Sequence, residues 1–300
     1  MQGIILKALS GFYYVSCDGT LYECRARGSF RKNGITPLVG DEVDFTPTDT
    51  SHGVVDSIYP RRTELVRPPV ANIDKLFIVS SYSTPAPDPL LIDRLCAIAV
   101  FHKIEPVIVF NKCDTGDMSD WQRIYNATGL KTFVVSALTG DGIDQLKQEL
   151  CGCVSAFAGN SGVGKSSILN ALFDELNITT GNVSEKLGRG RHTTRHTELY
   201  PHALDGFIAD TPGFSSLETG RDDLEFKERL SECFPDIAKH TDGCRFSTCT
   251  HTKESGCAVL KALADGKIEP TRHSSYIALF EEMKDLKPWE QSKHQNFKKR

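Results

Sequence analysis

Residues 107–114 read VIVFNKCD, and residues 159–167 read GNSGVGKSS. In the first stretch an apolar strand runs into Asn-Lys-x-Asp, a pattern that reads guanine in nucleotide-binding proteins. The second stretch fits G-x-x-x-x-G-K-[ST], the pattern of a phosphate-binding loop. The usual order places the phosphate loop first, and this chain places it second. Either one motif is accidental, or the chain is a circular permutation of the usual order.

The phosphate loop has the sequence context that its chemistry requires. VSAFA before Gly159 predicts a strand, and SSILNALF after Lys165 predicts a helix. Glycines would let backbone N–H groups surround phosphate oxygens at the helix N-terminus. Lys165 would then neutralise the β- and γ-phosphates, and Ser166 would bind Mg²⁺. A glycine-rich turn without a ligand is the alternative, and the flanking strand and helix disfavour it.

Two further motifs downstream fit the same nucleotide site. GFIADTPGF predicts a strand that ends in Asp-x-x-Gly, where Asp210 would anchor Mg²⁺ and the Gly213 N–H would sense the γ-phosphate. Between the two motifs, residues 188–200 read GRGRHTTRHTELY, in the place of a first switch loop. Thr194 is the predicted Mg²⁺ ligand of that switch, with Thr193 as the alternative.

The guanine motif also stands in a fitting context, at the end of a predicted buried strand. Asp114 would accept both guanine N–H groups, while Asn111 holds the loop and Lys112 packs over the base. VVSALTGDG follows the next strand, and its Ser136-Ala137 backbone fits the second guanine contact. Asp114 disfavours an ATP-dependent enzyme. Because each motif follows a suitable strand, the sequence predicts a permuted GTP-binding domain and not an accident.

The predicted catalytic group differs from that of ordinary GTPases in one respect. Phe214 follows Asp-x-x-Gly at a position that often holds a water-orienting glutamine. We therefore expect slow intrinsic hydrolysis, with water oriented by His192, by His196 or by a partner. Lys165 and Thr194 complete the predicted catalytic residues.

A cluster of possible metal ligands lies near the C-terminus. CRFSTCTHTKESGC supplies Cys244, Cys249, His251 and Cys257, which make a full tetrahedral set for one structural zinc ion. The chain has ten cysteines, and in a reducing compartment close spacing points to a metal before a disulfide. A chance cluster of buried thiols is the alternative. Cys233 is predicted to belong to the core.

The chain divides into three predicted parts. Residues 1–68 contain five short segments with alternating apolar and polar residues, which favours a compact Greek-key barrel such as the OB-fold. Residues 69–220 alternate strands and helices, which predicts a parallel sheet covered on both faces. Residues 221–300 are predicted to be a helical zinc-binding domain with a basic tail. In the barrel, residues 26–34 (ARGSFRKNG) are predicted to form a basic loop, either solvated or in contact with nucleic acid.

The overall composition fits a globular protein without a membrane anchor. Hydrophobic residues make up 39% of the 300 residues, charged residues 25%, and the formal net charge is −4. No apolar run approaches twenty residues, so we expect no transmembrane helix. The N-terminus does not resemble a secretory signal, so we expect a cytoplasmic location.

Taken together, these motifs closely resemble the RsgA (YjeQ) family of circularly permuted GTPases that act in small ribosomal subunit biogenesis. The permuted order and the Cys-Cys-His-Cys cluster carry the resemblance, which spans essentially the whole chain. It implies an OB-fold, a central GTPase domain and a zinc-containing helical domain. It also implies a role in late maturation of the small ribosomal subunit, with hydrolysis stimulated by that subunit and followed by release.

The resemblance further implies which residues contact the nucleotide and which partners bind. It assigns the whole run Gly159, Asn160, Ser161, Gly162, Val163, Gly164, Lys165, Ser166 and Ser167 to phosphates and Mg²⁺. It makes the basic segment 26–34 and the C-terminal tail candidates for contact with ribosomal RNA, and we expect a monomer. An RNA-binding scaffold, whose conformation is set by bound nucleotide with little turnover, is the alternative function.

Overall fold

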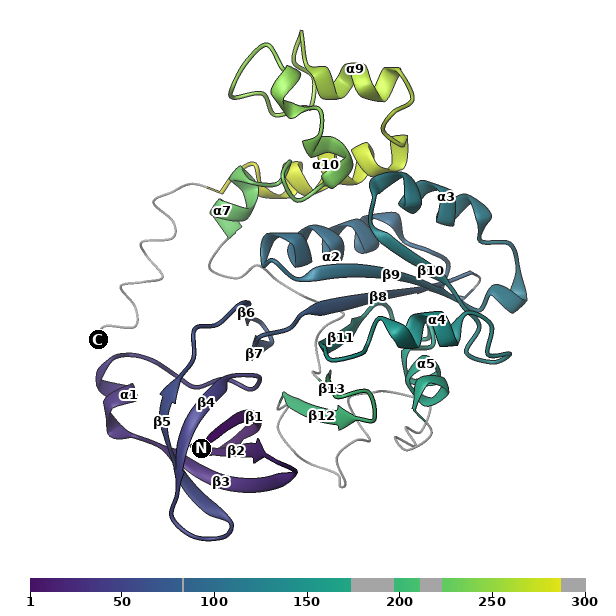
Figure 1. Ribbon diagram of the computed structural model, residues 1–300. Helices are drawn as coiled ribbons and strands as arrows, with labels where there is room; N and C mark the ends of the chain where they lie inside the picture. The colour runs from purple at the N-terminus through teal and green to yellow at the C-terminus, as the bar shows by residue number, and fades with distance from the viewer. Residues whose placement is uncertain (83, 174–196, 211–222, 287–300) are drawn as a thin grey trace.

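The computed structural model describes residues 1–82, 84–173, 197–210 and 223–286 (Figure 1). Three units follow one another along the chain: an N-terminal β-barrel, a central sheet between helices, and a helical C-terminal unit. The functional motifs of the described residues lie in the second and third units.

The barrel is closed by five strands. They are β1 (Gln2–Leu9), β2 (Phe12–Cys17), β3 (Thr20–Ala26), β4 (Glu42–Pro47) and β5 (His52–Ile58). Their order is β1-β2-β3-β5-β4, and β4 pairs back with β1. Inward-facing side chains such as Ile5, Val15 and Phe45 fill the interior and are inaccessible to solvent. The predicted OB-type barrel is confirmed.

The predicted basic loop 26–34 is wrong in part, because Gly28–Lys32 forms the short helix α1. Phe30 explains the difference, since its side chain is 8% exposed and packs into the barrel core. Burying this ring draws the segment into a helical turn against the barrel. Arg27 is also not free, because its Nε donates to Asp56 Oδ1 at 2.7 Å.

Two joints lie at the edge of the barrel. At the first, Arg61 of the segment that leaves the barrel donates from Nε and Nη2 to the fully buried Asp41, at 2.7 and 2.8 Å. This joint precedes a small hairpin of β6 (Glu64–Val66) and β7 (Pro69–Ala71). At the second, Lys7 of β1 pairs in register with Glu198 of β12 (Glu198–His202), and their side chains form an ion pair of 2.9 Å. The barrel and the central sheet thus form one continuous hydrogen-bonded surface.

The central sheet has the order β10-β9-β8-β11-β13-β12 and is parallel except for β12. Its other strands are β8 (Lys75–Ser81), β9 (Glu105–Asn111), β10 (Lys131–Val134), β11 (Val154–Ala158) and β13 (Gly206–Asp210). The strand that leads into the phosphate loop, β11, lies inside the sheet between β8 and β13, although β8, β9 and β10 all precede it in the chain. This is the arrangement that a circular permutation produces, and the prediction is confirmed.

Helices cover both faces of this sheet (Figure 1). One face carries α2 (Pro89–Phe101) and α3 (Ser119–Thr128), and the other carries α4 (Ile143–Gln148) and α5 (Lys165–Leu172). Buried strand residues such as Leu76 and Phe77 point to opposite faces and so belong to separate apolar cores.

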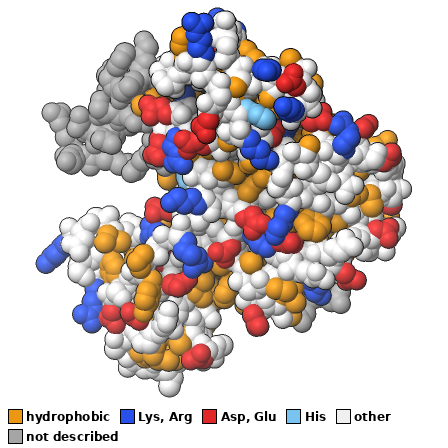
Figure 2. Space-filling view, turned by 45° about the horizontal axis from the view of Figure 1, so that its top comes forward, with side chains coloured by type: hydrophobic (Ala, Val, Ile, Leu, Met, Phe, Trp, Pro, Cys, Tyr) orange, Lys and Arg blue, Asp and Glu red, His pale blue; other side chains and the backbone are white. Residues whose placement is uncertain are grey.

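The C-terminal unit packs on the face that carries α2. Its helices are α7 (Asp223–Glu228), α8 (Pro235–Ala238), α9 (Ala258–Ala264) and α10 (Pro270–Met283). The core of this unit is continuous with the core beneath α2, and Cys233 is buried within it, as predicted. On the face shown in Figure 2, Lys and Arg side chains are interspersed with Asp and Glu side chains, in keeping with the small net charge.

Candidate functional site

The two opening motifs meet at the carboxyl edge of the parallel strands. The guanine motif continues from the end of β9, and the phosphate loop continues from the end of β11. Strand β8 lies between β9 and β11, so both loops emerge on the same side of the sheet. This edge is where parallel sheets bind ligands.

Asn111 joins three of the predicted motifs. Its side-chain Nδ2 donates to the carbonyl of Val163 in the phosphate loop at 3.0 Å. Its Oδ1 accepts the backbone N–H of Ala137 in the second guanine loop at 3.1 Å. Gly164 must lack a side chain here, because a Cβ would lie 2.3 Å from Asn111 Nδ2. The residue predicted to hold the loop thus holds all three loops together.

Lys112 and Asp114 are also held in place. Lys112 Nζ donates to the carbonyl oxygens of Thr84 and Gly162, at 2.7 and 2.8 Å. Asp114 is exposed, and its Oδ1 accepts the hydroxyl of the buried Ser136 at 2.5 Å. An exposed carboxylate with one oxygen fixed from behind can offer its remaining lone pairs to N–H donors.

The phosphate loop wraps its lysine closely. Lys165 Nζ donates to the carbonyls of Gly159 and Asn160 at 2.7 and 2.8 Å, and burial lowers the pKa of Lys165. Gly159 has a φ of 131° and passes against β8, where a Cβ would lie 2.1 Å from the Val79 carbonyl. Helix α5 begins at Lys165, so its N-terminal N–H groups lie beside the loop. The arrangement concentrates donors and positive charge in a site suited to phosphate.

Only part of the predicted magnesium set lies in the described residues. Ser166 follows Lys165 in the first turn of α5, and Asp210 ends β13, the neighbour of β11 in the sheet. Both therefore come from the edge that carries the phosphate loop, and a hydroxyl with a carboxylate suits Mg²⁺. The remaining predicted residues, Thr194 with its alternative Thr193, His192, His196, Gly213 and Phe214, lie outside the described residues.

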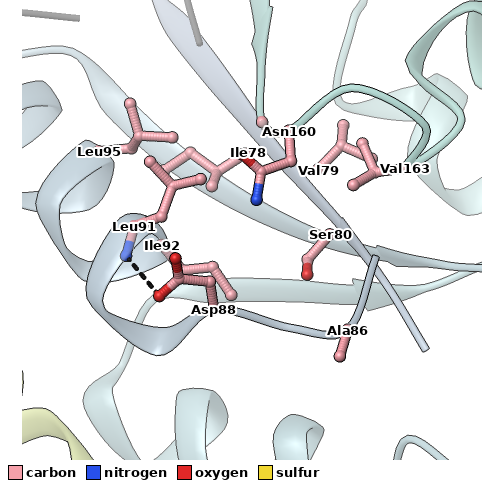
Figure 3. Close-up of a pocket in the computed structure, with 11 residues that line it drawn as sticks. Ile78, Val79, Ser80, Ala86, Asp88, Leu91, Ile92, Leu95, Asn160 and Val163 are labelled. Carbon is pink, nitrogen blue, oxygen red and sulfur yellow. Dashed lines mark hydrogen bonds between the residues drawn. The ribbon is translucent and has the colours of Figure 1, made fainter. Parts of the chain in front are cut away.

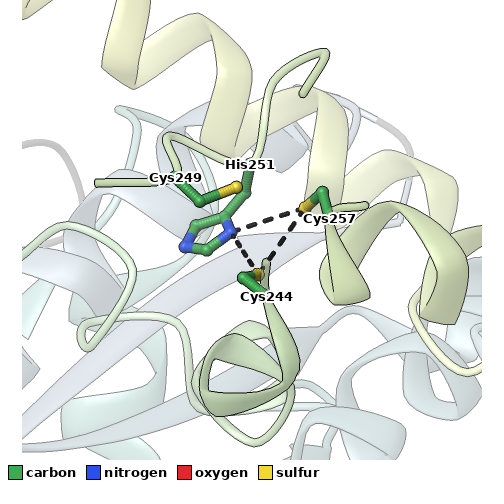
Figure 4. Close-up of side chains that lie close together, drawn as sticks. All are labelled: Cys244, Cys249, His251 and Cys257. Carbon is green, nitrogen blue, oxygen red and sulfur yellow. Dashed lines mark hydrogen bonds between the residues drawn. The ribbon is translucent and has the colours of Figure 1, made fainter. Parts of the chain in front are cut away.

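The four predicted zinc ligands converge in the C-terminal unit (Figure 4). Their ligand atoms all lie within 4.8 Å of one another. His251 Nδ1 is 3.5 Å from Cys244 Sγ and 3.6 Å from Cys257 Sγ, and the two sulfur atoms are 3.9 Å apart. Zinc bond lengths in a tetrahedral site place ligand atoms about 3.5–3.8 Å apart. The cluster is therefore compatible with one zinc ion.

The surroundings of the cluster favour a bound cation. Backbone N–H groups of Ala258 and Leu260, at the start of α9, approach the sulfur atoms of Cys244 and Cys257 at 3.4 Å. Burial, with the neighbouring thiols, raises the pKa of Cys249 to about 12. Three thiolates at such distances repel one another unless a cation lies between them, which is what zinc supplies.

Residues around the ligands fix the loop that carries them. His273 Nε2 lies 2.9 Å from the carbonyl of His251, and Tyr276 Oη donates to the carbonyl of Thr250 at 2.9 Å. Glu254 accepts hydrogen bonds from Thr250 and from the backbone N–H groups of Thr252 and Lys253. These supporting residues were not predicted, because a hydrogen bond to a backbone group has no sequence signature.

Among the described helices, none is long and apolar enough to cross a membrane.

The chain matches two family models. One is described as the RsgA GTPase and matches residues 58–220, and the other as the RsgA N-terminal domain and matches residues 2–55. The small ribosomal subunit biogenesis GTPase RsgA of Geobacillus thermodenitrificans (strain NG80-2) is 45% identical over 293 residues, which cover 96% of this chain and 99% of the relative. The same-named protein of Caldanaerobacter subterraneus subsp. tengcongensis is 42% identical over 288 residues, covering 95% and 96%.

Solved structures agree with these matches. The crystal structure of YloQ, a circularly permuted GTPase, has a TM-score of 0.79 and 35% identity, covering 96% of each chain. The crystal structure of YjeQ from Thermotoga maritima has a TM-score of 0.80 and 31% identity, covering 95% of this chain and 99% of that one. The family predicted from the motifs is confirmed: the chain belongs to the RsgA GTPase family and is a GTP-hydrolysing enzyme.

Proposed function

We propose that this GTPase acts in late maturation of the small ribosomal subunit, is stimulated by that subunit, and leaves it after hydrolysis. One observation carries the proposal: the guanine and phosphate loops meet at one sheet edge through Asn111 in the permuted order. The relatives that share this order over nearly their whole length are named small ribosomal subunit biogenesis GTPases.

The base would be read by the loops after β9 and β10. Asp114, exposed and steadied by Ser136, would accept the two guanine N–H groups. Lys112 would cover the base from its anchorage on the Thr84 and Gly162 carbonyls. The Ser136-Ala137 backbone would supply the second guanine contact, with the Ala137 N–H turning from Asn111 Oδ1 to the guanine carbonyl oxygen.

The phosphates would lie in the loop of residues 159–167, with Lys165 moving from the loop carbonyls to the β- and γ-phosphate oxygens. Ser166, Thr194 and Asp210 would hold Mg²⁺, which supplies neutralisation of the phosphate charge. The Gly213 N–H would sense the γ-phosphate. Because Phe214 cannot orient water, His192, His196 or the ribosomal subunit would supply that orientation, and the chain alone would turn over slowly.

Each of the three parts of the chain would have its own role. Residues 1–68 would act as an RNA-facing barrel, residues 69–220 as the GTPase domain, and residues 221–300 as a zinc-stabilised unit with a basic tail. Cys244, Cys249, His251 and Cys257 would bind one structural zinc ion. The protein would act as a monomer in the cytoplasm, where its ribosomal RNA partner is assembled.

Multiple-turnover GTP hydrolysis by the purified chain tests this proposal. The rate is measured alone, with saturating small ribosomal subunits, and with large subunits as a matched RNA-rich control. Stimulation of at least about 100-fold by small subunits only is expected, as for GTPases whose catalytic help comes from a partner. Lys165→Ala should abolish the stimulated rate. A rate that stays slow with every partner would favour the nucleotide-locked scaffold instead.

A further inference from the structure

A buried group of three charges joins the C-terminal unit to the central sheet. Arg272 of α10 is 1% exposed, and its Nη1 donates to Asp93 of α2 at 2.5 Å. The same guanidinium donates from Nη2 and Nε to both oxygens of Asp236 in α8, at 2.8 and 3.2 Å. Asp93 is fully buried and Asp236 is 6% exposed. One side chain therefore ties two helices of the C-terminal unit to α2.

The contacts of Arg272 fix how the helices that it joins are oriented relative to one another. Its guanidinium lies 4.6 Å from the centre of the Phe234 ring and 5.8 Å from that of Tyr125. An apolar residue would fill this space at a lower desolvation cost. Burying a charged side chain is unfavourable unless its hydrogen bonds and ion pairs are well formed. A planar guanidinium with two carboxylates instead fixes the relative position of the helices, since its hydrogen bonds fail on a small shift.

The turn of α2 that Arg272 holds also lines the back of the phosphate loop. Figure 3 shows a small pocket where side chains from the start of α2 face that loop across the end of β8. Leu91, Ile92 and Leu95 line one side, and Gly159, Asn160 and Val163 line the other. Asp93 lies within this same turn, which rises only about 5 Å along the helix axis.

A second contact joins the segment before α2 to the phosphate loop. Lys112 Nζ donates to the carbonyls of Thr84 and Gly162, so it connects the segment entering α2 with the loop. Pro85 packs close by, because a Cβ built on Gly162 would lie 3.5 Å from its Cδ. The start of α2 and the phosphate loop therefore line one pocket, and Lys112 links the loop to the segment that leads into α2.

We propose that Arg272 is a positioning residue for the phosphate loop: by holding Asp93, it sets the first turns of α2, against which residues 159–163 lie. The C-terminal unit thereby acts on nucleotide affinity through α2. This inference rests on the proposed role of residues 159–167 in phosphate binding. It needs no contact between Arg272 and the nucleotide.

Arg272→Lys in the full chain tests the proposal. Lysine keeps a buried positive charge between the two carboxylates, so the fold is retained, but it cannot bind both carboxylates as a fork. We expect GDP to bind about tenfold more weakly, within the usual range of coupling between sites. Hydrogen exchange of peptides covering residues 159–165 should become faster in the nucleotide-free protein, which a loss confined to the C-terminal unit would not cause.

The matched control is Glu282→Gln, which removes an exposed ion pair between the same two helices, Arg94 to Glu282 at 2.6 Å. An exposed pair contributes little, so neither readout should change. A folded Arg272→Lys protein with full zinc content and unaltered GDP affinity and loop exchange would overturn the proposal. Lys165→Ala tests the phosphate-binding role of residues 159–167 separately from the role of Arg272. If this variant leaves GDP affinity unchanged, the phosphate-loop assignment itself fails.

The unaltered protein supplies a second test should Arg272→Lys not fold. Coupling between sites is reciprocal, so GDP bound at the phosphate loop must stabilise the contact around Asp93. We expect GDP to slow hydrogen exchange in peptides covering residues 91–96 and 270–276. Protection confined to the nucleotide loops would contradict the proposal.

Discussion

Gly116 leaves no room for a side chain beside the guanine motif. A Cβ there would lie 1.9 Å from the ring of Tyr82, the residue that follows β8. Gly116→Ala must displace that ring, which is 37% exposed and can turn towards solvent. The cost is therefore below that of overpacking a closed core, and we expect GTP affinity to fall about threefold.

The matching rescue is Tyr82→Ala in the same chain. Removing the ring should return most of the GTP affinity to the Gly116→Ala protein, as measured by titration with a fluorescent nucleotide. If the double variant binds no better than Gly116→Ala alone, contact with Tyr82 is not what excludes a side chain at position 116.

Two fully buried serines should respond in opposite ways to alanine. The hydroxyl of Ser155 in β11 has no hydrogen-bond partner among the residues that the structure describes. Ser136 donates to Asp114 and accepts the N–H of Thr139 at 3.2 Å. Since an unpaired buried hydroxyl costs free energy, Ser155→Ala should leave stability unchanged or raise it by up to about 1 kcal/mol.

Ser136→Ala should lower the free energy of unfolding by about 1–2 kcal/mol, because it removes a hydrogen bond to a carboxylate. Urea unfolding of both variants measures the difference. A larger loss for Ser155→Ala than for Ser136→Ala would mean that Ser155 has a partner in solution.

Among the elements, the loop that carries the zinc ligands depends on Glu254. Burial alone would raise the pKa of this carboxyl, but hydrogen bonds from Thr250 and nearby backbone N–H groups lower it to about 2. Because this pKa lies below the ordinary 4.5, the stabilisation is complete above about pH 4.5 and is lost only as the pH falls towards 2. Glu254 is therefore ionised at neutral pH, where the zinc ligands bind the metal.

Glu254→Gln should therefore weaken zinc binding about tenfold at neutral pH and raise the pH of half-release, because a weaker site loses its zinc to protons earlier as the pH falls. Zinc retention measured with a chromogenic chelator across a pH series checks both parts. Unchanged zinc affinity together with an unchanged pH of half-release would show that Glu254 does not support the ligand loop.

Some helices and strands could be predicted from local sequence patterns alone, and others could not. Helix α2 and strands β8, β9 and β11 were predictable because an unbroken apolar run or a clear helical period fixes each one. Strand β12 was missed, because residues 198–200 were assigned to the end of the first switch. That strand is defined by pairing with β13 and β1, which are distant in sequence. Short elements whose stability comes from tertiary pairing carry no local pattern.

Across the protein as a whole, the two joints at the edge of the barrel should differ in strength. Arg61 faces the fully buried Asp41, whereas Lys7 and Glu198 keep side-chain exposures of 34% and 29%. Removing Arg61 leaves a buried carboxylate without its partner, and removing Lys7 leaves a solvated one. Arg61→Met should therefore cost about 3–5 kcal/mol, against less than about 1 kcal/mol for Lys7→Met.

Urea denaturation followed by tyrosine and tryptophan fluorescence measures both costs. Equal losses would contradict the prediction, because the buried Asp41 carboxylate would then depend on its partner no more than the partly exposed Glu198 does. Sequence alone could not rank these joints, because Asp41 and Arg61 lie in separate segments without a motif.

Sequence patterns predict residues of a nucleotide site more readily than the contacts around that site. Motif spacing predicts Asn111, Asp114 and Lys165 because each motif requires a given side chain at a given position. It did not predict the Arg272 contact, which depends on where α10 packs against α2. Charged residues far apart in a chain give no sign that folding will bury them together.

If two motifs in reversed order form one guanine nucleotide site, Asp114→Asn should change which base the protein prefers. Affinities for GDP and for xanthosine diphosphate are measured with both proteins. An asparagine amide can donate to the extra carbonyl oxygen of xanthine, whereas a carboxylate cannot, so the variant should prefer the xanthosine nucleotide. If Asp114→Asn keeps the original preference for GDP, residues 111–114 do not read the base and the account is wrong.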